Sequence, residues 1–155
     1  MNPVPTLCLA GLLLATQALD AQSASTFNRG CGPVATWPRL RVTKGTPKIG
    51  TQIQITGSLL SPGRPALTAV GISNQKWGSI NLPLMIDPTV GPPCQLLVSP
   101  DVILFGQSDK FGQQSLIFMI PNDRKLIGRT RYLQMANTSA TGLAHWTDGL
   151  ALKFG

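Results

Sequence analysis

The strongest constraint on the fold is the segment TQIQITG at residues 51–57, in which polar and apolar side chains alternate. Successive side chains of a β-strand point to opposite faces, so Ile53 and Ile55 would share one face of a sheet. A helix would place the two isoleucines on different sides. The segment therefore predicts a half-buried β-strand.

Eight further segments predict short strands, and turns formed from the chain's 16 glycines and 13 prolines separate them. They span residues 39–43, 66–73, 80–86, 94–98, 102–105, 113–120, 130–136 and 150–154. Pro83 predicts a sheet edge or a bulge in its segment, because proline cannot donate to a strand ladder. A helix-start signal followed by a glycine predicts at most one short helical turn near residues 122–127.

About seven to nine short strands without an amphipathic helix predict an all-β fold, an antiparallel β-sandwich. A small β-barrel is the alternative. We expect a signal peptide at residues 1–21, an irregular N-terminal arm at residues 22–38 and the sandwich domain at residues 39–155.

The N-terminus carries an apolar run at residues 7–19, which has the length of a signal-peptide core and is too short to span a bilayer. Small residues follow it, so we expect cleavage within residues 21–25 and loss of Cys8 with the peptide. The remaining chain has no apolar run long enough for a transmembrane segment. The sequence thus predicts a secreted or extracytoplasmic protein of the cell envelope.

Two cysteines remain after this cleavage, Cys31 and Cys94, and an even number in an exported protein predicts one disulfide. Metal binding is the weaker alternative, because the chain has no CxxC spacing and a single histidine. We expect neither a metal nor a cofactor.

The formal net charge of +7 arises from 13 basic residues against six aspartates. Such a charge indicates either an anionic partner or simply a soluble surface. The basic residues are spread out, with two local groups at residues 39–48 and 124–131. Neither group is interleaved with aromatic residues as a platform for single-stranded nucleic acid would be.

Five segments in order resemble an uncharacterised domain family found at the C-termini of secreted bacterial proteins. They are GCGP at residues 30–33, residues 47–78 with SNQKWG, residues 82–101 with GPPC, IPNDRKLIGRTRYLQ at residues 120–134 and DGLALKFG at residues 148–155. The resemblance implies a β-sandwich, an exported location and pairing of Cys31 with Cys94. It implies no activity.

We identify no catalytic residues and do not expect an enzyme. His145 is the only histidine, no serine lies on a GxSxG elbow, and we expect this histidine at the surface. The aspartates of the mature chain lie in predicted turns, where their carboxylates can cap main-chain amides.

The candidate ligand-binding residues are two tryptophans with their neighbours: Trp77 with Lys76 and Asn74, and Trp146 with His145. Exposed tryptophans stack on sugars, whereas buried ones would close the ends of the sandwich. The leading hypothesis is a non-catalytic exported structural or interaction module, and the alternative is a carbohydrate- or polyanion-binding module. The partner would be an envelope polymer, a polysaccharide or another exported protein.

Overall fold

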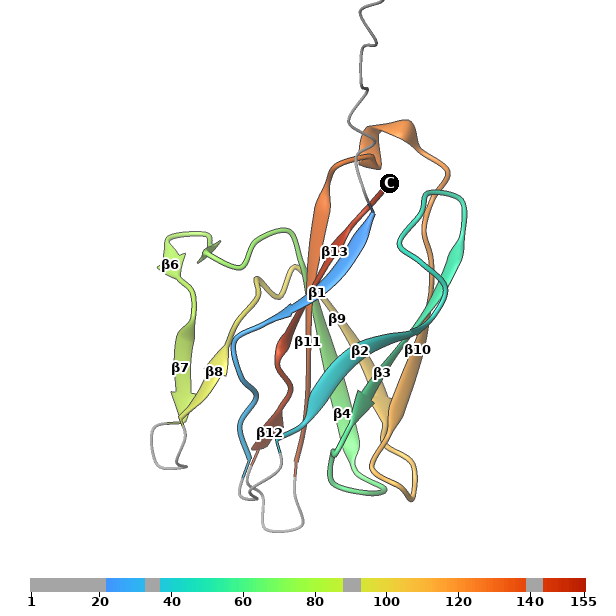
Figure 1. The fold of residues 1–155 in the computed structure, drawn as a ribbon. Coiled ribbons are helices and arrows are strands. Elements are labelled where there is room, and N and C mark those ends of the chain that lie inside the picture. The colour runs from blue at the N-terminus through green and yellow to red at the C-terminus, as the bar shows by residue number, and fades with distance from the viewer. Residues whose placement is uncertain (1–21, 33–36, 88–92, 139–143) are drawn as a thin grey trace, which may run out of the picture.

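The computed structural model describes residues 22–32, 37–87, 93–138 and 144–155, and these form two packed antiparallel sheets (Figure 1). Sheet A has the spatial order β1 (Ser23–Phe27), β13 (Gly149–Lys153), β11 (Thr130–Thr138), β4 (Pro65–Gly71) and β9 (Val102–Gln107), with β12 (Ala144–Trp146) paired to β11. Sheet B has the order β10 (Gln114–Met119), β3 (Gln52–Ser58) and β2 (Arg39–Lys44). The sheets do not close into a barrel, so the predicted sandwich is confirmed.

Two small hairpins and one 3-10 turn complete the described part of the chain. The hairpins are β5 (Lys76–Trp77) with β6 (Ile80–Asn81), and β7 (Leu84–Asp87) with β8 (Cys94–Leu96). The predicted strand at residues 80–86 is thus divided around Pro83. The turn η1 (Arg124–Leu126) confirms the predicted helical turn, and the Asp123 carboxylate caps it by accepting the Lys125 main-chain N–H at 2.9 Å.

The main core lies between the two sheets. Its buried side chains are Leu40, Ile53, Ile55, Leu60, Ile120, Leu133, Met135, Leu150, Leu152 and Phe154. Ile53 and Ile55 are both buried, as the alternation at residues 51–57 predicted. Full burial of such a side chain contributes about 1.5–3 kcal/mol.

A strand that the sequence did not predict, β1, lies within the expected arm at residues 22–38. All five of its residues pair with β13, beginning with Ser23 opposite Lys153. Its sequence SASTF has no apolar alternation, because β1 is an edge strand with mostly exposed side chains. The chain therefore joins sheet A before it reaches Cys31.

The segment around β8 covers part of the outer face of sheet A, the face turned away from sheet B. Leu97 and Val98 pack with Ala69, and with the partly buried Phe27 and Tyr132, in a second apolar cluster. The buried Gln134 side chain of β11 fixes this segment, since its Oε1 accepts the Leu97 N–H at 2.9 Å.

A disulfide joins Cys31 to Cys94, with a Cα–Cα distance of 5.1 Å. Both cysteines are buried, and the Cys31 N–H also donates to the Trp146 carbonyl at 2.8 Å. The bond ties the N-terminal segment to β8 and indicates an extracytoplasmic location.

The expected signal peptide, residues 1–21, lies outside the described residues. In the described part of the chain, no helix has the length and apolarity needed to cross a membrane.

Candidate interaction surface

The first candidate group, Trp77, Lys76 and Asn74, lies in and just before the β5–β6 hairpin. The Trp77 side chain is 41% exposed and Lys76 is exposed, whereas Asn74 is half-buried. The Lys76 N–H donates to the Ser73 hydroxyl at 3.0 Å, which holds the start of the hairpin. Trp77 is thus available to solvent.

The second candidate group, Trp146 and His145, lies on β12 in sheet A. Trp146 is half-buried, but His145 is only 6% exposed, so the prediction that this histidine is a surface residue is wrong. The reason is non-local: Cys31 bridges Trp146, and this brings Gly32 against the imidazole ring. In the described part of the chain neither ring nitrogen of His145 has a hydrogen-bond partner, and burial lowers its pKa.

The two candidate groups do not form one surface. Figure 1 shows β6 at the upper left and β12 near the bottom of the molecule, and the two strands belong to different sheets. A sugar platform shared by Trp77 and Trp146 is therefore not assembled. The third tryptophan, Trp37, is half-buried beneath the Arg29 guanidinium, which lies 5.0 Å from the ring centroid.

The predicted role of the aspartates as caps of main-chain amides is confirmed at four positions. Asp101 accepts the Ile72 N–H, Asp109 the Phe111 and Gln113 N–H groups, Asp123 the Lys125 N–H and Asp148 the Leu40 N–H. Among the described residues, no group of three or more His, Cys or Asp side chains is placed to hold a metal ion.

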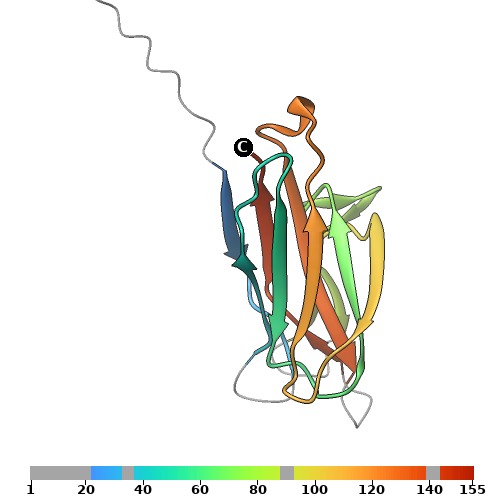
Figure 2. The same cartoon turned by 90° about the vertical axis from the view of Figure 1, so that its right-hand side faces the viewer.

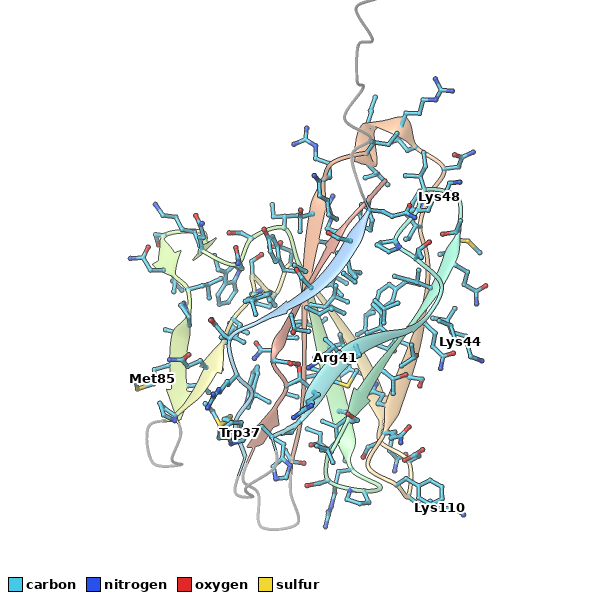
Figure 3. The ribbon with its side chains drawn as sticks, in the orientation of Figure 1. Trp37, Arg41, Lys44, Lys48, Met85 and Lys110 are labelled. Atoms are coloured by element: carbon cyan, nitrogen blue, oxygen red, sulfur yellow. A yellow bond between two sulfur atoms is a disulfide. The ribbon has the colours of Figure 1, made fainter. Side chains whose placement is uncertain are left out.

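The two flanks of the sandwich differ in how their edge strands are protected. Figure 2 shows β1 (blue) on the left, near β2, and β9 (yellow) on the right, on the same side as β10. Strand β2 carries Arg39, Arg41 and Lys44 and has a register shift between Val42 and Lys44. Charges and bulges of this kind protect an edge against added strands. Figure 3 shows Arg41 and Lys44 along this strand.

The opposite flank has no such protection. Strand β9 has the sequence VILFGQ, which contains no charged residue and no proline, and β10 has the sequence QSLIFM. Six exposed large apolar side chains lie on these strands and the turn between them. This apolar flank comprises Val102, Ile103, Phe105, Phe111, Ile117 and Met119.

An apolar groove continues this flank across the outer face of sheet A. Phe105 pairs with Leu67, Leu67 with Ala136, and Ala136 with Trp146. Directly paired residues share a face, so these side chains form a row across four strands. The small Ala136 side chain leaves space between its neighbours, and the groove has a volume of about 270 Å³. At its open end Phe105 is 81% exposed.

Comparison with protein-family models, with curated proteins and with solved structures finds no match for this chain. The resemblance described above thus stays a prediction.

Of the residues predicted as ligand-binding, only Trp146 lies on the groove. Sequence reasoning missed Phe105, Leu67 and Ala136, although the run VILF at residues 102–105 marked an apolar strand. Such a run is typical of a buried strand, and only the sheet order places it at an edge.

Proposed function

We propose that this protein is a non-catalytic exported interaction module that binds an extended segment of another exported protein as an added strand on β9. The observation that carries the proposal is the unprotected edge of β9, with Phe105 and Ile103 exposed beside it. His145 is buried and has no hydrogen-bond partner among the described residues, which also favours a non-catalytic role, because a general base must reach the proton it removes.

Addition of a strand uses two features of this flank. The outer edge of β9 offers main-chain N–H and C=O groups, which give affinity in strand addition, and pockets for alternate side chains give specificity. A side chain of the added strand next to Phe105 would extend the row formed by Phe105, Leu67, Ala136 and Trp146. We therefore expect the partner strand to carry apolar side chains at every second position, on the face that it shares with the groove.

The net charge favours a partner other than a second copy. Two copies, each with a formal charge of +7, would repel one another, whereas a protein with acidic residues around its binding strand would be attracted. The β9 strand itself is uncharged, so the central part of the partner segment would also be uncharged. The proposed occupant is thus an extended apolar strand with acidic flanks.

The test uses a synthetic peptide that alternates valine and threonine and has glutamate at both ends. Binding is measured by calorimetry with the unaltered protein and with Phe105→Lys, which adds a protecting charge at the edge. The matched control is Met85→Lys on β7, because Met85 is also an exposed apolar residue but lies away from β9, as Figure 3 shows.

We expect Phe105→Lys to weaken peptide binding about tenfold or more and Met85→Lys to change it less than about twofold. A peptide with proline at its centre should not bind, because proline removes a ladder N–H. Equal binding by both lysine variants, or by the proline peptide, would overturn the proposal. Self-association of the unaltered protein that Phe105→Lys abolishes would overturn the choice of partner.

A further inference from the structure

The end of the sandwich at η1 carries a hollow with a basic lining. It has a volume of about 600 Å³, and its lining includes Ile72, Lys125, Arg129, Arg131 and Tyr132. The three cations come from η1, from the turn that follows it and from the start of β11. The fold thus gathers part of the basic group at residues 124–131 around one concave surface.

These three cations have no counterion within the described part of the chain. The ion pair found there joins Arg41 to Asp148, on other elements. The nearby carboxylates of Asp101 and Asp123 accept main-chain N–H groups of Ile72 and Lys125, at 2.8 and 2.9 Å. Lys125 and Arg129 are exposed, so an anion in solution can reach them.

We infer that this hollow binds an anionic polysaccharide, and the inference is independent of the proposed function. Several cations around a hollow of this size suit a chain with repeated carboxylate or sulfate groups rather than a single small anion. Base stacking would need an exposed aromatic ring. The lining aromatic, Tyr132, is half-buried and packs edge-on against Phe27, with ring centroids 5.9 Å apart. A polysaccharide therefore fits the site better than a single-stranded nucleic acid.

The experiment measures binding of the exported protein to dextran sulfate, with neutral dextran and single-stranded DNA for comparison, over a range of salt concentrations. The site variant combines Lys125→Gln, Arg129→Gln and Arg131→Gln. The control variant combines Lys44→Gln, Arg64→Gln and Lys110→Gln, which removes the same charge from exposed positions on other elements. Figure 3 shows Lys110 at the bottom of the molecule, whereas η1 lies at the top, near Lys48. Lys110 is therefore far from the hollow.

We expect the site variant to lose about tenfold or more in affinity for dextran sulfate and to show a shallower salt dependence. The control variant should stay within about threefold of the unaltered protein. Arg131 is half-buried and its Nη1 donates to the Thr130 carbonyl, so its replacement could also disturb the fold. The double variant Lys125→Gln/Arg129→Gln, which keeps Arg131, is therefore measured as well. Its affinity for dextran sulfate should fall at least about threefold.

Three outcomes would overturn the inference. An equal loss in the site and control variants would show that only net charge matters. Tighter binding of single-stranded DNA than of dextran sulfate would show the wrong class of polymer. Absence of binding to dextran sulfate at low salt would show that the hollow holds no polyanion.

Discussion

The Nη1 atom of Arg41 lies 2.6 Å from Oδ2 of Asp148, and the other oxygen of the same carboxylate accepts the Leu40 N–H at 2.7 Å. Leu40 and Arg41 belong to β2 in sheet B, whereas Asp148 directly precedes β13 in sheet A. This carboxylate therefore links the two sheets of the sandwich. Asp148 is buried, while the Arg41 side chain is 43% exposed.

We predict that Asp148→Ala lowers the free energy of unfolding by about 2–3 kcal/mol, because it leaves the buried Leu40 N–H without an acceptor. Arg41→Ala should cost less than about 1 kcal/mol, since the Asp148 carboxylate keeps the hydrogen bond from the Leu40 N–H and solvent at the partly exposed Arg41 side chain screens the ion pair. Urea unfolding of both variants measures the difference. Equal losses in the free energy of unfolding would show that the hydrogen bond from the Leu40 N–H is not the main contribution of Asp148.

The buried His145 predicts a loss of stability in mild acid. Burial lowers the pKa of this imidazole below its ordinary value of 6.5, so the unfolded chain binds a proton more readily than the folded one. Its contribution to stability is complete above about pH 6.5 and is lost as the pH falls through the folded-state pKa. Unfolding free energies measured between about pH 5 and 7 should rise with pH.

The matched variant for this prediction is His145→Leu, which places an apolar side chain in the buried site and cannot titrate. The variant should lose most of the pH dependence in this interval, because His145 is the chain's single histidine. If the free energy of unfolding depends on pH equally in the unaltered protein and in His145→Leu, groups other than His145 cause the dependence.

The disulfide predicts a large stability effect from its place in the chain. It closes a loop of 63 residues, for which chain entropy gives about 4 kcal/mol. The double variant Cys31→Ala/Cys94→Ala should therefore unfold at a much lower urea concentration than the oxidised protein. If the free energy of unfolding falls by less than about 1 kcal/mol, the unfolded chain is already constrained between these two positions without the disulfide.

The pairing of β1 predicts where the proposed signal peptide is cleaved. Ser23 is the first residue opposite β13, so a cut after Ala21 or Gln22 leaves the whole strand in place. A cut after Ser25 would remove three paired residues. Mass spectrometry of the mature protein, isolated from the cells that produce it, measures the N-terminus, and a chain beginning at Thr26 would contradict this prediction.

Local pattern was enough to predict the strands that supply the core. Ile53 and Ile55 alternate with polar residues, and Leu40 is flanked by two arginines, so each indicates its own buried face. The helical turn and the caps by Asp109 and Asp123 were also predictable, because each depends on residues close in the sequence. Asp101 and Asp148 cap the amides of Ile72 and Leu40, which lie 29 and 108 residues away, so these two contacts depend on the fold.

Features that depend on distant segments could not be predicted in this way. His145 is buried because Cys31 pairs with Trp146, and β1 forms because β13 offers an edge to it. The exposure of Phe105 follows from the position of β9 at the end of sheet A, which the residues of β9 do not indicate. The candidate surface was therefore found only in the folded chain.

The most direct test of the proposed interaction is amide hydrogen exchange measured residue by residue, with and without the valine–threonine peptide. We predict slower exchange at amides of β9, Val102–Gln107, when the peptide is present, and no change in β2, whose edge is protected by charge. Unchanged exchange in β9, or equal protection of both edges, would contradict the claim that this flank binds an added strand.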